Sequence, residues 1–157
     1  MPEITSERWQ QLYDRAFPQV YRALVAATFD RERALDGLHD AFEEGLRHPP
    51  SDDRNLEGWL YRVALRKTRR SLLRAFREAP MTELSSDDPT AAVLHRLEVG
   101  QLLALLTERQ RAIVVAHYYL GLTQEEIAEA LGVRRGTVSA TVSQSLARMR
   151  ERGATNG

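Results

Sequence analysis

Residues 123–150 read TQEEIAEALGVRRGTVSATVSQSLARMR and predict two helices joined by a tight turn. Thr123 and Glu126 have the spacing of a capping box, so a helix should begin at Gln124. Gly132 can adopt the left-handed conformation that ends this helix. A second helix should begin near Arg135, and its apolar stripe consists of Val138, Val142, Leu146 and Met149. The pattern is typical of a helix-turn-helix, which places its second helix in the major groove of DNA. An αα-corner inside any helical domain has the same spacing.

The composition limits the class of protein. The chain has 157 residues, enough for one ordinary domain or two small ones, and 43% of them are apolar, which suffices for helical cores. It has no cysteine, which excludes disulfides and thiolate metal sites. The N-terminus lacks the apolar run of a signal peptide, and no apolar run approaches the roughly 20 residues that span a bilayer. We therefore expect a soluble, unprocessed, cytoplasmic protein.

Charge is distributed unevenly, although the formal net charge is zero. Residues 59–78 hold seven basic residues and one acidic residue, whereas residues 1–58 hold seven and twelve. If Leu56 to Glu78 form one helix, the cations fall within a sector of about 160°, with Trp59 among them. An aromatic ring beside cations favours single-stranded nucleic acid. The alternative is a solvated arginine face with Trp59 folded back into the core.

Helical periodicity continues on both sides of this segment. From Ser6 to Val25 apolar residues recur at intervals of three and four, which predicts one helix or two helices that meet at Pro18. Residues 31–46 repeat the pattern. The segment that follows, RHPPSDDRN, contains two prolines and small polar residues and predicts a loop.

The second half of the chain begins after a change in composition. Residues 79–93 contain two prolines and three acidic residues without a strong period, which predicts a linker. A helix should follow from Val93 to Leu106, and a Thr107–Gln110 capping box should open another that ends at Gly121. The expected fold is therefore all-α, with two small helical domains joined by a linker. The expected boundaries are 1–78 for the first domain, 79–93 for the linker and 94–157 for the helix-turn-helix domain.

Two distant parts of the chain resemble one family, the bacterial RNA polymerase sigma factors of the extracytoplasmic-function (ECF) type. Residues 107–138, TERQRAIVVAHYYLGLTQEEIAEALGVRRGTV, are similar to its fourth-region pattern LPERQREVLLLRYxEGLSYEEIAEILGVPxGTV. Residues 34–46, ALDGLHDAFEEGL, and 59–64, WLYRVA, are similar to its second-region patterns AEDLVQEVFLRAW and WLYRIA. The resemblance covers roughly residues 9–150.

The resemblance implies a protein that binds core RNA polymerase and directs promoter recognition, DNA melting and transcription initiation. The implied polymerase-binding residues are Asp36, His39, Asp40 and Phe42. The residues implied for the downstream promoter element and its melting are Asn55, Trp59, Arg62, Arg66, Arg69 and Arg70. Asn55 lies in the predicted loop RHPPSDDRN, and its amide can both donate to and accept from a base edge. The residues implied for the upstream element are Arg134, Arg135, Thr137, Ser139, Ala140, Ser143 and Gln144. An anti-sigma factor becomes a candidate partner, and no cofactor, membrane or small-molecule substrate is expected.

The first half departs from the family patterns at several positions. His39 and Asp40 replace a Gln and a Glu of the polymerase-binding motif, and Gly37 replaces a Leu. Arg66 and Arg70 replace an Asn and an Asp in the helix after WLYRVA, which removes an expected polar contact and adds positive charge. These departures leave open whether the promoter preference follows that of the family pattern.

The recognition helix departs more strongly. Ser139, Thr141 and Gln144 replace cations, so phosphate anchors are missing between Arg135 and Arg148. Hydroxyl groups can still bond phosphates, but they add little electrostatic attraction. We therefore expect weak binding of the free protein to duplex DNA, with selectivity gained only when polymerase holds both domains on one promoter.

Two other classes of function stay open at the level of sequence. A stand-alone helix-turn-helix regulator would bind duplex DNA through its second domain, and a palindromic site and a stable dimer would support it. An enzyme has little support, because the four histidines are scattered and no HExxH or P-loop spacing occurs. Asp36 and Asp40 lie one helical turn apart and could ligate a metal, but a protein-binding acidic face explains them more simply.

Overall fold

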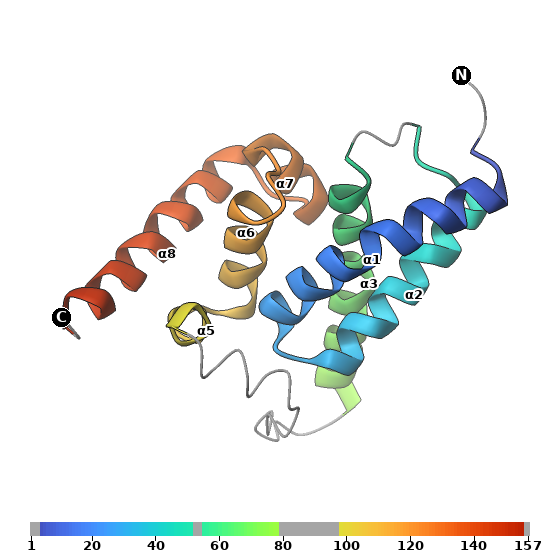
Figure 1. Cartoon of the computed structure of the whole chain (residues 1–157). Coiled ribbons are helices and arrows are strands. Elements are labelled where there is room, and N and C mark those ends of the chain that lie inside the picture. The colour runs from blue at the N-terminus through green and yellow to red at the C-terminus, as the bar shows by residue number, and fades with distance from the viewer. Residues whose placement is uncertain (1–3, 52–54, 79–97, 156–157) are drawn as a thin grey trace.

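The computed structural model describes residues 4–51, 55–78 and 98–155, and every regular element within these ranges is an α-helix (Figure 1). The predicted all-α fold is therefore confirmed. The expected linker 79–93, the start of the helix expected at Val93, and loop residues 52–54 lie outside the described ranges. Among the described helices, none combines the length and apolarity that a bilayer crossing requires.

The first three helices form a bundle (Figure 1). They are α1 (Ser6–Thr28), α2 (Arg31–Arg47) and α3 (Leu56–Glu78). Pro18 lies inside an uninterrupted α1, so the single helix is the correct one of the two alternatives. Phe29 ends α1 with a φ of 55°, a left-handed conformation that non-glycine residues seldom adopt. Asp30 then caps α2 by accepting a bond from the Arg33 N–H, so the chain reverses within two residues.

Trp9 is at the centre of the packing between α1 and α2. Its side chain is 1% exposed, and its indole N–H donates to the Phe42 carbonyl at 3.0 Å. The ring lies directly over Gly45 of α2, where the Cβ of any other residue would overlap it. Because position 45 has no side chain, the two helices can approach closely enough to bury an indole between them.

The second half contains four described helices: α5 (Glu98–Leu103), α6 (Glu108–Tyr118), α7 (Gln124–Leu131) and α8 (Arg135–Thr155). Both predicted capping boxes are present with both of their hydrogen bonds, Thr107 with Gln110 and Thr123 with Glu126. Gly132 ends α7 with a φ of 66°, as predicted. The helix-turn-helix formed by α7 and α8 is therefore confirmed.

Two predicted helix ends differ from the structure. The helix expected to reach Leu106 ends at Leu103, and the N–H groups of Leu105 and Leu106 bond to carbonyls three residues earlier. The chain must leave the helix there because Thr107 is extended, with a ψ of 161°, to cap α6. Likewise α6 ends at Tyr118 rather than at Gly121, which has a φ of 69° in the turn that follows.

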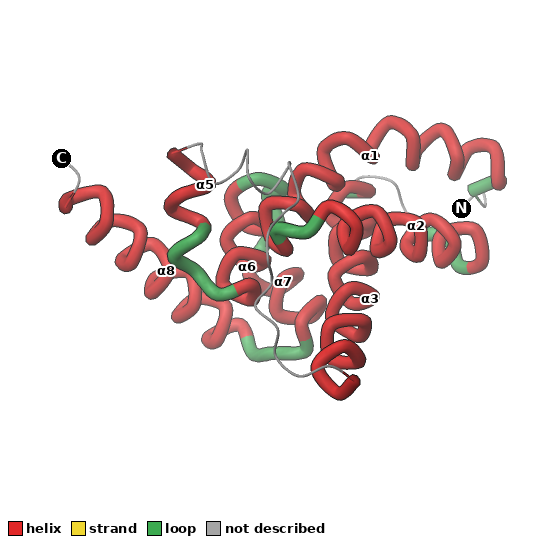
Figure 2. Tube along the Cα trace, turned by 90° about the horizontal axis from the view of Figure 1, so that it is seen from below, coloured by secondary structure: helices red, strands yellow, loops and turns green. Residues whose placement is uncertain are grey.

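The two halves of the chain pack against each other. Helix α1 packs on α6, and α3 packs on α7 (Figures 1 and 2). Buried side chains of both halves form one continuous hydrophobic cluster, which includes Val20 and Leu24 on one side and Ile113 and Leu122 on the other. Helices α2 and α8 lie on opposite sides of the molecule in both views. Division into two domains at residues 78 and 94 stays a prediction, because the described helices share this cluster.

Candidate functional site

The residues expected to contact the upstream element lie on the polar face of α8, except Arg134, which directly precedes the helix. Each of them is exposed: Arg134, Arg135, Thr137, Ser139, Ala140, Ser143 and Gln144. On the opposite side Val138 and Val142 are buried, and Leu146 and Met149 are partly buried. Helices α6 and α7 cover this apolar stripe. Packing therefore leaves the predicted recognition surface free for a DNA groove.

Two contacts within the protein reduce the positive charge and the hydrogen-bond donors that this surface can offer to DNA. The Arg135 guanidinium lies 3.2 Å from the carboxylate of Glu125 on α7, and the two side chains are 67% and 62% exposed. The Thr141 hydroxyl donates to the Thr137 carbonyl at 2.7 Å, so it is directed back onto its own helix. One cation is therefore partly neutralised, and one hydroxyl proton is already used.

The exposed side of α2 brings three of the four expected polymerase-binding residues together. Asp36, His39 and Asp40 are exposed and line a cavity of about 280 Å³ with Arg33, Gly37, Lys67 and Thr68. Lys67 Nζ lies 3.9 Å from the Glu44 carboxylate, which links α3 to α2 beside the cavity. Among the described side chains, no cluster of three His, Asp or Glu has the grouping of a metal site.

Phe42, the fourth expected polymerase-binding residue, has a different position. Its side chain is half-buried, and its ring centroid lies 4.7 Å from that of Tyr13 and 6.3 Å from that of Trp9. The helical period explains this difference, because a residue two positions after Asp40 lies on nearly the opposite side of the helix. The structure therefore separates Phe42 from the three polar residues and packs it against α1.

The basic side of α3 is described only in part. Arg62 is half-buried and Arg66 is exposed, whereas the side chains of Arg69 and Arg70 lie outside the described ones. On the side of α3 away from the cations, Tyr61, Ala64 and Thr68 are buried and Leu65 is half-buried. Leu60 is also buried, at 0% exposure, on a helix that packs against α1, α2 and α7.

Trp59 and Asn55 lie at the start of α3, and each has a structural contact of its own. Trp59 is half-buried, with its ring edge-on to Trp9 at a centroid distance of 5.5 Å. The Asn55 side-chain oxygen accepts from the Gly58 N–H at 3.2 Å, so Asn55 acts as a cap of α3. The alternative in which Trp59 packs against the core is therefore confirmed in part. A role for either residue on DNA has to be compatible with these contacts.

Sequence reasoning missed a set of contacts made by the first turn of α6. Glu108 Oε1 lies 2.6 Å from Arg33 Nη2 of α2. Arg111 Nε donates to the Ala27 carbonyl of α1 at 2.9 Å, and its guanidinium lies 4.1 Å from the centre of the Phe29 ring. These partners are 75 and 84 residues apart in sequence, so no local pattern could have indicated them.

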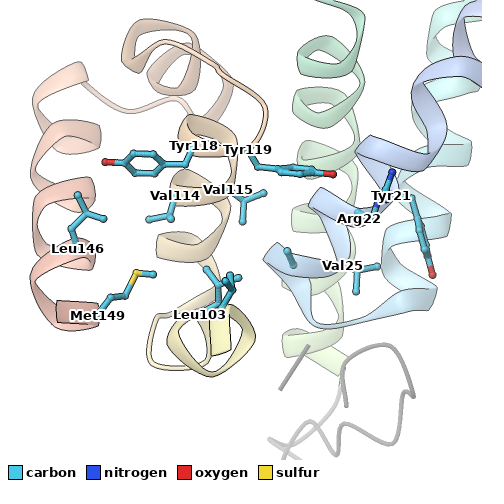
Figure 3. A pocket seen from close by; sticks show the side chains of 12 residues that line it. Tyr21, Arg22, Val25, Leu103, Val114, Val115, Tyr118, Tyr119, Leu146 and Met149 are labelled. Atoms are coloured by element: carbon cyan, nitrogen blue, oxygen red, sulfur yellow. The ribbon is translucent and has the colours of Figure 1, made fainter. Parts of the chain in front are cut away.

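A second feature not predicted from sequence is an apolar groove between the halves (Figure 3). It has a volume of about 490 Å³, and among the described residues that line it the one charged side chain is that of Arg22. Tyr118 and Tyr119 lie at its edge and are 58% and 47% exposed, which is unusual for neighbouring aromatic residues. In Figure 3 the Tyr118 ring extends towards α8 and the Tyr119 ring towards α1. The other lining residues are Tyr21, Val25, Ala26, Val99, Leu103, Val114, Val115, Leu146 and Met149.

Comparisons with known proteins find similar chains among the sigma factors. Residues 96–149 match the family model described as sigma-70, region 4. The ECF RNA polymerase sigma factor SigL of Mycobacterium tuberculosis is 27% identical over 150 residues, which cover 88% of this chain and 85% of that protein. The RNA polymerase sigma-E factor of Streptomyces avermitilis is 36% identical over 106 residues, 64% of this chain and 59% of the relative.

Two solved structures have the same fold. The sigma factor RpoE in complex with the anti-sigma factor NepR from Bartonella quintana matches with a TM-score of 0.68 and 18% identity, covering 90% of this chain and 94% of that one. CnrH in complex with the cytosolic domain of CnrY matches with a TM-score of 0.58 and 19% identity, covering 96% and 90%. Fold, family model and relatives agree with the motifs in both halves of the sequence, and the chain is therefore similar along most of its length to the ECF-type sigma factors of bacterial RNA polymerase.

Proposed function

We propose that this sigma factor binds core RNA polymerase, carries it to promoter DNA and helps to open the duplex for initiation. The observation that carries the proposal is the surface of α8. This helix lies within the part of the chain that matches region 4, and its apolar stripe is buried while its opposite, polar side is exposed. A stand-alone regulator is not favoured, because the match to SigL extends along 88% of the chain rather than along the helix-turn-helix alone. The protein would act in the cytoplasm, where its polymerase is.

The upstream element would be read by α8 within the proposed domain 94–157. Arg134 and Arg135 stand at the start of the helix and would contact phosphates, while Ser139, Ser143 and Gln144 would meet base edges. Because Glu125 competes for Arg135, the phosphate contribution of this helix is small. This supports the expectation that polymerase, and not the isolated helix, provides most of the affinity.

The downstream element would be held by the proposed domain 1–78, at the loop before α3 and along the basic side of α3. Among the described side chains of α3, Arg66 is the best candidate for a DNA contact, because it is exposed. Arg69 and Arg70 would extend the basic track along the opened strand. Asn55 would contact a base through its amide group while it continues to cap the helix. The proposed linker 79–93 would join the two DNA-binding parts.

Polymerase would dock on the exposed side of α2. Asp36, His39 and Asp40 surround the cavity there, and the Nε and Nη1 atoms of Arg33 beside it are buried without a hydrogen-bond partner in the described part of the chain. Such a mixed set of donors and acceptors suits a polar protein partner. Phe42 would support this surface from the core side instead of touching polymerase.

An anti-sigma factor is the proposed inhibitory partner. Two solved structures with this fold, RpoE and CnrH, are complexes, one with NepR and one with the cytosolic domain of CnrY. In this chain the apolar groove between α1, α6 and α8 would accept the apolar side of a partner helix, with Arg22 offering a charge at the rim. We propose that this groove is the binding site for a helix of the anti-sigma factor.

A reconstituted transcription assay tests the main proposal. The purified chain should co-elute with core polymerase at low salt and support initiation from a cognate promoter. Asp40→Arg should weaken the association, because a reversed charge at a docking contact repels the partner. Asp14→Arg is the matched control. Asp14 is exposed on α1, so the substitution makes the same charge change outside the proposed polymerase-binding surface of α2. Failure of the wild-type chain to co-elute would contradict the proposal.

A further inference from the structure

The part of the apolar groove next to α8 carries no charge. Val114 and Tyr118 extend into it from α6, and Leu146 and Met149 extend towards them from α8 (Figure 3). Leu146 and Met149 are only partly buried, and Tyr118 is 58% exposed. Apolar surface therefore stays open to water here, and a ligand that covers it gains the free energy of its burial. We call this part of the groove its tail end.

The part of the groove next to α1 adds hydrogen-bond donors to an apolar wall. Val115 and Tyr119 extend there from α6, and Arg22 lies opposite them on α1 (Figure 3). Tyr119 is 47% exposed, and its hydroxyl makes no hydrogen bond within the described part of the chain. In Figure 3 its ring extends towards α1 and Arg22. We call this part of the groove its head end.

Arg22 determines which charge the head end can accept. Its side chain is exposed, and its Nε donates to the Pro18 carbonyl at 3.2 Å, which holds the guanidinium beside α1. The N–H groups on its two Nη atoms have no partner within the described ranges, and no described carboxylate pairs with them. A guanidinium in this state suits a carboxylate, which can accept two parallel hydrogen bonds from it. The head end is therefore complementary to a single negative charge.

The size and shape of the groove favour a small ligand with a flexible apolar chain. Its volume of about 490 Å³ lies within the roughly 300–1,000 Å³ of sites that bind small molecules. Four helices line it: α1, α5, α6 and α8. A ligand that matches both ends needs an anionic group at one end and an apolar body without further polar groups. A single-chain fatty acid has this chemistry.

We propose that the groove binds a fatty acid, with its carboxylate on Arg22 and the Tyr119 hydroxyl and its alkyl chain over the tail end. This binding does not depend on the proposed function. A bound chain would occupy the space proposed for the anti-sigma helix, so the fatty acid and the helix would exclude each other. Only that consequence rests on the proposed function.

Isothermal titration calorimetry of the full-length chain tests the chemistry of the ligand. Octanoate, decanoate and dodecanoate, each below its micelle-forming concentration, should bind at one site per chain. Each added pair of methylene groups should tighten binding by up to about 15-fold. Decanol, which has a neutral head, should bind up to about fivefold more weakly than decanoate, the limit for a solvent-exposed charge pair. Absence of binding, many weak sites per chain, or equal affinity for decanol would overturn the proposal.

A pair of matched variants tests the head end. Arg22→Gln should weaken decanoate binding by up to about fivefold and abolish the preference for decanoate over decanol. Arg15→Gln makes the same change at an exposed residue of α1 outside the groove and should leave both affinities unchanged. Tyr119→Phe should weaken the binding of decanoate only. Circular dichroism checks that each variant is folded. An Arg22→Gln variant that binds decanoate as the wild type does would contradict the proposal.

The position of the alkyl chain has a readout of its own. Met149 lines the tail end and is one of three methionines in the chain, so its methyl resonance can be assigned in a spectrum of ¹³C-methyl methionine with Met149→Leu. Dodecanoate should shift this resonance in proportion to the bound fraction found by calorimetry. Binding that leaves the Met149 resonance unmoved would place the ligand elsewhere and overturn the site. These measurements use the chain alone, so a failure to bind polymerase would contradict the proposed function and leave them unaffected.

Discussion

Helix α2 and the start of α8 each contain an interhelical arginine–glutamate pair and a glycine that can be compared, in opposite surroundings. On α2, Arg33 pairs with Glu108 at 2.6 Å with 14% and 29% of the side chains exposed. On α8, Arg135 pairs with Glu125 at 3.2 Å with 67% and 62% exposed. Gly45 of α2 lies under the Trp9 ring, whereas a Cβ on Gly136 of α8 would meet nothing within 4 Å. The same residue types therefore fix the structure in one region and leave a surface free in the other.

Charge reversal should separate the two ion pairs most clearly. Glu108→Arg would bring a third cation next to Arg33 and Arg111, and we expect it to lower the free energy of unfolding by about 3 kcal/mol, as for a broken buried pair. Glu125→Arg should change it by less than about 1 kcal/mol, because water screens an exposed pair. Urea denaturation followed by circular dichroism measures both. Similar small losses for the two variants would show that the pair of Arg33 with Glu108 adds nothing to stability.

The two glycines should respond to alanine in opposite directions. Gly45→Ala would force Trp9 to move within a packed core, and we expect a loss of about 1–3 kcal/mol. Gly136→Ala has free space and restricts the unfolded chain, so it should stabilise the protein by up to about 1 kcal/mol. Thermal and urea unfolding of the two variants provide the comparison. A stable Gly45→Ala variant with unchanged Trp9 fluorescence would contradict the packing described for α2.

Alkaline pH should weaken the buried region. Burial raises the pKa of Tyr61, and burial with the nearby Asp14 charge raises the pKa of Tyr13 to about 12. Above pH 10 an unfolded tyrosine loses its proton while these two keep theirs, so stability is complete below that pH and falls as the pH rises. Each group contributes a slope of up to about 1.4 kcal/mol per pH unit. Tyr61→Phe should therefore show a shallower decline between pH 10 and 11 than the wild type. Equal slopes would contradict a protonated, buried Tyr61.

The smallest effect is expected at the exposed pair, and on DNA binding rather than on stability. Glu125→Gln releases Arg135 for a phosphate, so the slope of log affinity against log salt should steepen by up to about 0.9. The gain in affinity should stay below about 1 kcal/mol. Fluorescence anisotropy of an upstream-element duplex with the full-length chain measures both, with Glu129→Gln as an exposed control on α7. An unchanged slope would mean that Arg135 does not contact the backbone of DNA.

Local sequence signals predicted the helices well. The capping boxes at Thr107 and Thr123 and the left-handed Gly132 depend on residues three to nine positions apart, so they could be read directly from the chain. Periodicity also predicted which side of α8 is exposed. The polymerase-binding role of Phe42 came from the family pattern, which marks a position without saying which way the side chain points, and it stays a prediction.

Contacts between the halves could not be predicted in this way. The pair of Arg33 with Glu108 and the bond from Tyr61 to Ala112 join residues 75 and 51 positions apart. Their existence depends on how α6 packs on α1, which no single-helix pattern specifies. The burial of Leu60 has the same origin, because α3 is covered by helices from both halves.

The position of Trp9 over Gly45 has a consequence for how this protein can diverge. The pattern that residues 34–46 resemble has Ala and Trp where this chain has Gly45 and Leu46, and here Leu46 is 43% exposed. The indole that covers α2 comes from α1 instead. A homologue that regains a side chain at position 45 must therefore lose the large ring at position 9, and one that keeps the ring must keep the glycine. Positions 9 and 45 should covary among descendants of this sequence, with a side chain at position 45 tolerated only after the ring at position 9 is lost.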